Sequence, residues 1–256
     1  MKKRVDLLLV SKKLVESRSK AQAMIMAGQV KVNGKQINKS GEIISVEANI
    51  TIENLHPQWV SRGALKLLHA LDYFKIDITD FICLDIGAST GGFSQVLLNQ
   101  NVKKIYAVDV GKNQLHEKLR QEEKIINIPG TNARYLNYEI IKDEVDIIVC
   151  DVSFISMKKV ILPSLKFLEK KRGIVIGLIK PQFESSRNEL QKGGVILNPE
   201  IHKRICQDFR EWFLSQCKMQ VQEIIPSPII GPKGNIEFLI YAKQKSTNNA
   251  NNDQLR

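Results

Sequence analysis

The chain has 256 residues, a length that allows one large domain or two modest ones. Its formal net charge is +11, and most of it lies at one end, because the first 40 residues carry ten basic and two acidic side chains, leaving +3 for the other 216. With 43% hydrophobic and 25% charged residues, the chain can bury a full core, which excludes intrinsic disorder as its main state. A cationic head on a nearly neutral body indicates a polyanion-binding module joined to a second domain.

The first ten residues imitate a secretory signal, with a basic start and an apolar run. Asp6 interrupts that run and Ser11 stops it, so it falls short of the roughly 7–15 apolar residues of a signal peptide. No apolar stretch in the sequence approaches the roughly 20 residues that a spanning helix needs. We therefore expect a cytoplasmic protein with no membrane partner.

Two short helices and a hairpin are predicted next. Val5, Leu8 and Leu9 recur at helical spacing, and Ser17 or Ser19 can cap a second helix over 20–27. The segment 29–35 then alternates polar and apolar residues and closes on Asn-Gly, the strongest short hairpin signal. The head is thus expected to be a small α+β unit.

This head resembles the S4 RNA-binding domain over roughly residues 3–55. The resemblance rests on Arg4-Val5-Asp6, on the string Ser-Arg-Ser-Lys-Ala over 17–21 and on Gly-Gln-Val-Lys-Val-Asn-Gly over 28–34. It implies an RNA-binding domain at 1–58. A single basic side chain is more often only solvated, but this density of charge favours a collective role at RNA phosphates. The residues concerned are Lys2, Lys3, Arg4, Arg18, Lys20, Lys31 and Lys35.

From residue 60 onward, strand-like apolar runs alternate with helical stretches. The strands are expected at 82–86, 104–110, 125–128, 145–150 and 174–179, and the helices at 92–100, 113–121, 158–169 and 200–217. This alternation predicts an α/β fold with a mostly parallel sheet covered on both faces. Two last strands, 219–226 and 236–242, bring the sheet to seven, with a Pro/Gly loop between them.

A glycine-rich turn joins the first of these strands to its helix, in the string Leu-Asp-Ile-Gly-Ala-Ser-Thr-Gly-Gly-Phe over 84–93. Asp109 closes the second strand 22 residues after Gly87, a spacing at which a carboxylate reaches ribose hydroxyls. The Gly-x-Gly-x-x-Gly pattern of nicotinamide dinucleotide sites is missing. The turn instead resembles the S-adenosylmethionine (SAM) motif of FtsJ-type methyltransferases with a Rossmann-like fold. That resemblance implies a cofactor site formed by Asp85, Gly87, Ala88, Ser89, Thr90, Gly91, Gly92, Phe93, Asp109, Asn132 and Asp151; for Asn132 a plain turn is an equal alternative.

Four polar residues, far apart in the sequence, are expected to meet at one edge of the sheet. Asp151 and Lys180 directly follow strands, and Lys66 lies on the helix before the first strand. Glu237 stands at the start of the last strand, and the resemblance to FtsJ-type methyltransferases implies that this strand is antiparallel, so that its start lies at the same edge. Their order resembles the Lys-Asp-Lys-Glu tetrad of FtsJ-like ribose 2′-O-methyltransferases. With the S4-like head, the chain resembles the TlyA family of rRNA (cytidine-2′-O)-methyltransferases, often called haemolysins. The methyltransferase domain would span 59–245, followed by a disordered tail at 246–256.

The family resemblance implies a concrete chemistry. A ribose hydroxyl must lose its proton as it attacks the sulfonium methyl, and a lysine of depressed pKa can take that proton or stabilise the alkoxide. We assign this role to Lys180, placed between Lys66 and the two carboxylates, with Lys66 lowering its pKa and holding the ribose. Asp151 and Glu237 would orient the lysines. Phe154 and Phe183 flank the site and have two interpretations, stacking on a base or packing in the core.

Two alternatives to a 16S or 23S rRNA methyltransferase remain. A non-catalytic rRNA-binding or assembly factor need not keep all four tetrad residues, and a haemolysin would need a membrane-active segment. The four cysteines and four histidines show no metal-ligand spacing, so no metal is expected. The expected partners are rRNA and ribosomal subunits, for a monomer or a weak homo-oligomer. The family linker often carries Arg two residues before Trp-Val, where this chain has Pro57, so communication between the domains is left open.

Overall fold

The computed structural model describes residues 2–15, 17–26, 28–52, 58–191 and 193–245. The chain divides into two compact units, one formed mainly by residues up to Arg62 and one that begins at Gly63. The linker position Pro57 and the predicted tail over 246–256 lie outside the described residues.

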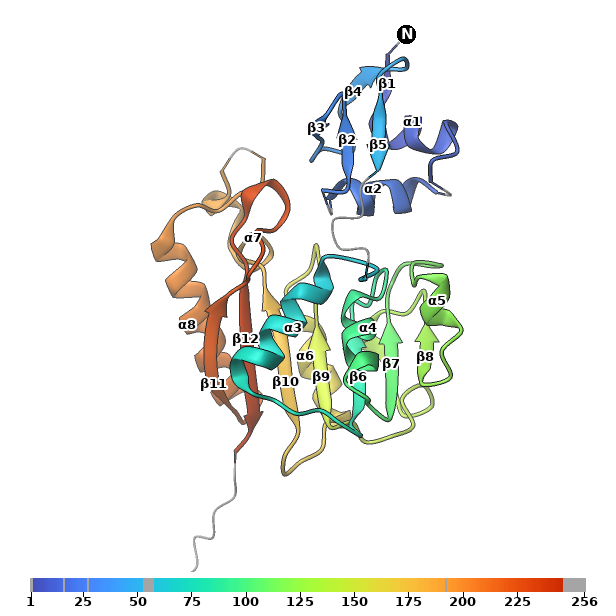
Figure 1. The fold of residues 1–256 in the computed structure, drawn as a ribbon. Helices are drawn as coiled ribbons and strands as arrows, with labels where there is room; N and C mark the ends of the chain where they lie inside the picture. The colour runs from blue at the N-terminus through green and yellow to red at the C-terminus, as the bar shows by residue number, and fades with distance from the viewer. Residues whose placement is uncertain (1, 16, 27, 53–57, 192, 246–256) are drawn as a thin grey trace, which may run out of the picture. The chain divides into compact units, whose positions relative to one another are not determined.

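The smaller unit is a small α+β structure (Figure 1). Its elements are β1 (Lys2–Arg4), α1 (Val5–Ser11), α2 (Arg18–Met26), β2 (Val30–Val32), β3 (Lys35–Gln36), β4 (Ile43–Ser45) and β5 (Ile50–Ile52). Strand β1 pairs antiparallel with β4, and β2 lies between β3 and β5. Apolar side chains from both helices and from the strands form one core, which includes Leu9, Ile25 and Val30.

The predicted helices and hairpin of this unit are confirmed, with small differences at their ends. The hydroxyl of Ser17 accepts a hydrogen bond from the backbone N–H of Lys20 at 3.2 Å, so α2 begins at Arg18 and not at Lys20. Asn33 and Gly34 both have positive φ, 50° and 78°, as the two central residues of a type I′ hairpin turn require. Strands β1, β4 and β5 were not predicted, because three residues are too few for an alternating pattern to be recognised.

The larger unit is built on a seven-stranded sheet in the order β11-β12-β10-β9-β6-β7-β8. Its strands are β6 (Ile82–Ile86), β7 (Lys104–Val108), β8 (Ile125–Ile128), β9 (Ile147–Cys150), β10 (Ile174–Ile179), β11 (Met219–Pro226) and β12 (Phe238–Gln244). Strand β12 is antiparallel to both of its neighbours, and the other pairings are parallel. This confirms the predicted mostly parallel, Rossmann-like sheet.

Helices cover both faces of this sheet. Figure 1 shows α3 and α4 on the face toward the viewer and α6 on the opposite face. Helix α8 packs against β11, and α3 packs against α4. The helices are α3 (Gly63–Phe74), α4 (Gly92–Asn99), α5 (Glu117–Arg120), α6 (Lys158–Ser164), α7 (Pro181–Glu184) and α8 (Pro199–Ser215), with short 3-10 turns η1 (Ala133–Tyr135), η2 (Leu165–Phe167), η3 (Arg187–Glu189) and η4 (Pro232–Gly234).

The apolar runs that form the central strands are buried as expected, whereas the edge strand β8 is half exposed. Every residue of β9 and β10 is buried, because both strands lie in the middle of a sheet that is covered on two sides. Two predicted helices are shorter than expected. The helix predicted over 113–121 is confined to α5, and the one over 158–169 ends at Ser164, directly after Pro163, and continues only as the turn η2.

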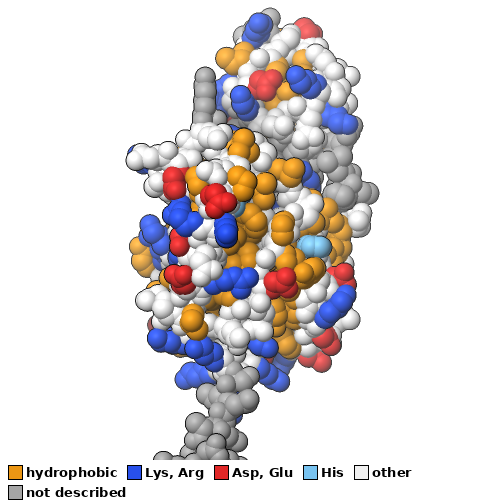
Figure 2. Space-filling model, turned by 90° about the vertical axis from the view of Figure 1, so that its left-hand side faces the viewer, with side chains coloured by type: hydrophobic (Ala, Val, Ile, Leu, Met, Phe, Trp, Pro, Cys, Tyr) orange, Lys and Arg blue, Asp and Glu red, His pale blue; other side chains and the backbone are white. Residues whose placement is uncertain are grey.

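The larger unit has a surface of mixed charge and buried cysteines. Basic and acidic side chains are interspersed on the face of this unit that Figure 2 shows. Cys83, Cys150 and Cys217 are buried free thiols. Within the described part of the chain, no helix is long and apolar enough to cross a membrane, and no group of His, Cys, Asp and Glu has the arrangement of a metal site.

Candidate active site

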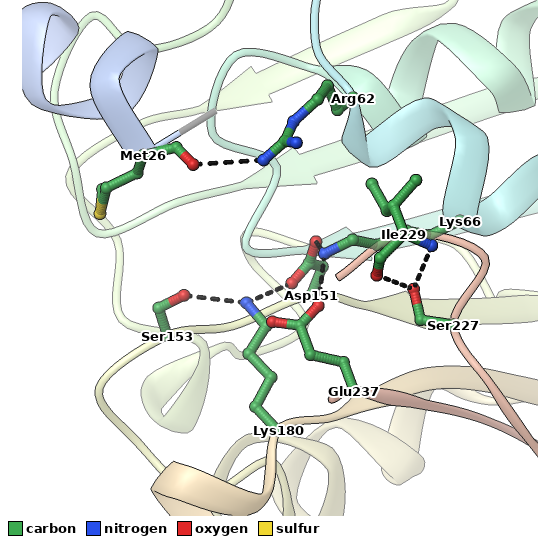
Figure 3. Close-up of polar contacts among 9 residues, drawn as sticks. All are labelled: Met26, Arg62, Lys66, Asp151, Ser153, Lys180, Ser227, Ile229 and Glu237. Atoms are coloured by element: carbon green, nitrogen blue, oxygen red, sulfur yellow. Dashed lines mark hydrogen bonds and ion pairs between the residues drawn. The ribbon is translucent and has the colours of Figure 1, made fainter. Parts of the chain in front are cut away.

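The four predicted tetrad residues meet at the carboxyl edge of the parallel strands (Figure 3). Asp151 directly follows β9, Lys180 directly follows β10, and Glu237 directly precedes the antiparallel β12, whose start lies at the same edge. The fourth residue, Lys66, points to them from the first turn of α3. The sheet topology therefore brings together side chains that are up to 171 residues apart in the sequence.

Short ion pairs link the four side chains into a row. Lys66 Nζ donates to Glu237 Oε2 at 2.7 Å and lies 3.8 Å from Asp151 Oδ2. Lys180 Nζ lies 2.6 Å from Asp151 Oδ1. The order is Glu237, Lys66, Asp151, Lys180, so Asp151 lies between the two lysines; the prediction that Lys180 lies between Lys66 and both carboxylates is wrong. Two ammonium groups and two carboxylates balance, which allows this row to be largely buried.

Ser153 extends the row and was missed by the sequence analysis. Its hydroxyl accepts a hydrogen bond from Lys180 Nζ at 2.9 Å. The only sequence signal is its place two residues after Asp151, in the loop that follows β9. Lys180 is thus held from two points of that one loop.

The electrostatics of the row contradict one prediction. Burial by itself lowers the pKa of Lys180, but the charges of Asp151 and Glu237 outweigh it, and the pKa is raised above its ordinary value. Burial likewise raises the pKa of Asp151, and the two lysines outweigh it, so that this pKa is lowered. Both groups therefore carry their charge at neutral pH. The expectation of a depressed lysine pKa considered Lys66 and neglected the carboxylate at 2.6 Å.

The glycine-rich loop after β6 lies against the backbone of Asp151. Gly87 has φ +85°, and a Cβ there would lie 2.5 Å from the carbonyl oxygen of Asp151. Only glycine allows this approach without strain. The side chains of Ala88 and Phe93 are buried, and so is Gly92 at the start of α4. The loop therefore offers a ligand its backbone groups and the half-buried hydroxyl side chains of Ser89 and Thr90.

Asp109 braces that loop. Its Oδ2 accepts the backbone N–H of Ser89 at 2.8 Å, and its Oδ1 accepts the backbone N–H of Gly111 at 2.7 Å. A carboxylate oxygen has two acceptor positions, so one position per oxygen is left for a ligand hydroxyl. The helix α5 that follows begins only at Glu117, where the side chain of His116 accepts the backbone N–H of Lys118 and caps it.

Asp85 lies beneath the loop and does not reach the surface. Its side chain is fully buried, and its Oδ2 accepts a hydrogen bond from Ser94 Oγ at 2.6 Å. Burial raises the pKa of Asp85 to about 7, opposed by the Ser94 hydrogen bond and reinforced by the charges of Asp151 and Asp109. Any effect of Asp85 on a cofactor is exerted from below the loop.

Asn132 has the turn role that the sequence left as an alternative. Its side-chain oxygen accepts the backbone N–H of Arg134 at 3.1 Å and caps η1. Phe154 is 80% exposed, which contradicts core packing for this ring, and its ring centroid lies 5.2 Å from that of Phe183. Phe154 also has φ +66°, an unusual conformation for a bulky residue.

The predicted RNA-contacting residues lie on four elements of the smaller unit: Lys2, Lys3 and Arg4 on β1, Arg18 and Lys20 on α2, Lys31 on β2 and Lys35 on β3. Asp6 organises two of them. Its fully buried carboxylate pairs with Arg4 at 2.8 Å and with Arg18 at 3.1 Å, and the pKa of Asp6 is lowered well below its usual range, chiefly by the Arg4 hydrogen bond. Both arginine side chains stay about half exposed.

Comparison with known proteins gives two family matches. The FtsJ-like methyltransferase family matches residues 59–244, and the S4 domain matches residues 3–50. These spans agree with the two units of the fold and with the order of the two predicted domains.

Relatives of similar length cover nearly the whole chain. The chain is 37% identical to the 16S/23S rRNA (cytidine-2′-O)-methyltransferase TlyA of Mycobacterium tuberculosis, over 95% of this chain and 90% of the relative. It is 42% identical to hemolysin A of Brachyspira hyodysenteriae, over 93% and 98%. A solved structure from Streptococcus thermophilus, named as a hemolysin, superposes with a TM-score of 0.73 at 36% identity and covers 96% of this chain and 90% of that one.

Proposed function

The chain belongs to the TlyA family of FtsJ-like methyltransferases that carry an S4 domain, and we propose that it methylates the 2′-hydroxyl of a cytidine in 16S or 23S ribosomal RNA, within ribosomal subunits. The observation that carries this proposal is the row Glu237–Lys66–Asp151–Lys180 beside the loop that begins at Gly87. The complete row favours an enzyme over a non-catalytic rRNA-binding factor, since binding RNA alone does not need buried ion pairs at the edge of a sheet.

The residues around the loop after β6 fit SAM. The close approach of Gly87 to the backbone of Asp151 leaves the loop free of side chains there, and Asp109 keeps acceptor positions for ribose hydroxyls. The carboxylates of Asp109 and Asp151 suit a ligand that carries a sulfonium cation. SAM supplies an electrophilic methyl group when bound. Its proposed site is formed by Gly87, Ala88, Ser89, Thr90, Gly91, Gly92, Phe93, Asp109 and Asp151, with Asp85 supporting the loop from below and Asn132 shaping the turn before η1.

Lys180 is proposed to act as a fixed cation. An ammonium group has three N–H donors, and the contacts to Asp151 and Ser153 use two of them, which leaves one to donate to the ribose oxygen. The raised pKa of Lys180 favours stabilising the developing alkoxide over accepting its proton, which leaves to water as the oxygen–methyl bond forms and the methyl–sulfur bond breaks. Lys66 holds the ribose side of the site, and Glu237 and Asp151 orient the two ammonium groups. Alignment of oxygen, methyl and sulfur supplies the rest of the rate enhancement.

The amino-terminal domain, proposed to span 1–58, would bind rRNA phosphates through Lys2, Lys3, Arg4, Arg18, Lys20, Lys31 and Lys35. The paired, half-exposed guanidinium groups of Arg4 and Arg18 support this. The exposed ring of Phe154 offers a stacking surface for a base beside the methyltransferase site. The methyltransferase domain is proposed to span 59–245. An rRNA-modifying role places the protein in the cytoplasm, as a monomer or weak homo-oligomer that needs no metal.

The test supplies SAM with a radiolabelled methyl group to each purified ribosomal subunit from a strain that lacks the gene. We expect label at a cytidine ribose with the wild-type protein and with Lys171→Ala, a control at an exposed lysine, and none above background with Lys180→Ala. RNA binding without label on either subunit would favour the non-catalytic alternative. Undiminished labelling by Lys180→Ala would refute the role of Lys180 and leave the fold untouched.

A further inference from the structure

Two loops at the carboxyl edge of the sheet run against one another. The first, residues 151–157, follows β9 and leads into α6, and the second, residues 180–184, follows β10 and forms α7. They are joined at one end by Lys180, which contacts Asp151 and Ser153. The aromatic pair Phe154–Phe183 joins them in the middle.

Glu184 joins the other end of the two loops. Its Oε2 accepts the hydroxyl of Ser156 at 2.6 Å, and its Oε1 accepts the backbone N–H of Met157 at 2.7 Å. Both oxygens are thus used on consecutive residues of the first loop, and the second of these residues stands at the N-cap of α6. The side chain of Met157 is 1% exposed, so this end of the loop is anchored in the core.

The first loop needs such an anchor because backbone hydrogen bonds hold it only near its ends, where the N–H of Asp151 donates to the carbonyl of Ile86 and the carbonyl of Ser156 accepts the N–H of Lys159. Residues 151–156 belong to no helix or strand, and Phe154 has φ +66°, a conformation that costs free energy for a bulky side chain. Such a conformation persists only where the surroundings determine it. The contacts around it come from the second loop, at Lys180, Phe183 and Glu184.

We propose that Glu184 is a positioning residue for methyl transfer, which fixes the loop 151–157 so that Asp151 and Ser153 hold the ammonium group of Lys180 in place. This rests on the proposed function of Lys180. Glu184 touches neither the reacting groups nor the loop after β6 in these contacts. Asp151 itself stays bound to β6, because its backbone N–H donates to the carbonyl of Ile86 at 3.0 Å. The loss of Glu184 therefore loosens the loop beyond Asp151 and moves Ser153 and Lys180, while the loop after β6 keeps its place. A displacement of about 1 Å at a catalytic group costs on the order of 100-fold in rate.

The test compares Glu184→Ala, Glu184→Gln and Glu189→Ala. The glutamine keeps both contacts, because its oxygen can accept the N–H of Met157 and its amide can donate to the Ser156 hydroxyl. Glu189 is a matched control in the same segment, since its carboxylate binds Ser186 and Arg204 and does not contact the loop 151–157. The measurements are kcat on ribosomal subunits, the Kd for SAM, and hydrogen exchange of the peptide covering 151–157.

We expect Glu184→Ala to lower kcat by about 10- to 100-fold and to raise exchange in 151–157, with the Kd for SAM within about twofold of wild type. Glu184→Gln and Glu189→Ala should stay near wild type in all three. Ser156→Ala, which removes one contact only, gives a smaller loss in the same direction and serves if Glu184→Ala does not fold. Unchanged exchange and kcat in Glu184→Ala, or a glutamine variant as impaired as the alanine one, would overturn the proposal.

The two proposals fail separately. If the wild-type protein labels neither ribosomal subunit while exchange in 151–157 still rises in Glu184→Ala and not in Glu184→Gln, the anchoring by Glu184 stands and the rRNA substrate is wrong. If labelling is normal and exchange does not respond, the anchoring is wrong and the methyltransferase activity stands.

Discussion

Asp85 provides a stability test that needs no substrate. Its carboxyl group is fully buried at the end of β6, with one oxygen on Ser94 Oγ and the other without a hydrogen-bond partner among the described residues. Burial raises its pKa from 3.8 to about 7. The folded protein therefore binds a proton at Asp85 in a pH range in which the unfolded chain has released it.

The sign and the size of the effect follow from proton linkage. Between about pH 4 and pH 7 the native state binds more protons at Asp85 than the unfolded state, so the free energy of unfolding falls as the pH rises through this range. Since one pKa unit corresponds to about 1.4 kcal/mol, the full effect is about 4 kcal/mol, of which about 3 kcal/mol falls between pH 5 and pH 8. Asp85→Asn cannot titrate and removes this dependence.

Urea unfolding at pH 5, 6.5 and 8, followed by the fluorescence of Trp212 in a Trp59→Phe background, measures the difference. We expect the stability of Asp85→Asn relative to wild type to increase by about 3 kcal/mol between pH 5 and pH 8. Ser94→Ala is the companion variant, because loss of the hydrogen bond that lowers the pKa of Asp85 should steepen the pH dependence of the protein. A difference between Asp85→Asn and wild type that stays constant within about 0.5 kcal/mol over this range would refute the reasoning.

Three further outcomes are expected elsewhere. Gly87→Ala should weaken SAM binding at least about tenfold in calorimetry, because its φ of +85° and the nearby carbonyl of Asp151 leave no room for a Cβ; unchanged affinity would contradict the proposed cofactor loop. Asp6→Ala should lower the stability of the smaller unit by about 1–3 kcal/mol and weaken rRNA binding at low salt, since Arg4 and Arg18 lose their shared partner. Thermal unfolding measures the stability and filter binding measures the affinity for rRNA. Unaltered binding would contradict the proposed role of the two arginines at RNA phosphates. Asn235→Ala should raise hydrogen exchange around Ile196, because the backbone N–H of Ile196 donates to the Asn235 side chain at 3.1 Å. Equal exchange in the variant and the wild type would show that this contact does not hold the segment around Ile196 in place.

Several features of this protein follow from local sequence patterns. The strand β10 begins and ends where its apolar run begins and ends, because a strand buried on both faces of a sheet is apolar throughout. The alternation of strands and helices then places residues that follow parallel strands at one edge. That is why Asp151 and Lys180 could be assigned to a common site before their distance was known.

Only the tertiary structure decided how these side chains act on one another. The order of charges in the row, with Asp151 between the lysines, and hence the raised pKa of Lys180, depend on distances of a few ångströms between segments distant in sequence. The same holds for Ser153 and Glu184, whose partners lie on another loop and whose residue types are common on any surface. Periodicity and spacing report which way a side chain faces, whereas a pKa or a loop anchor is set by its nearest neighbours across the fold.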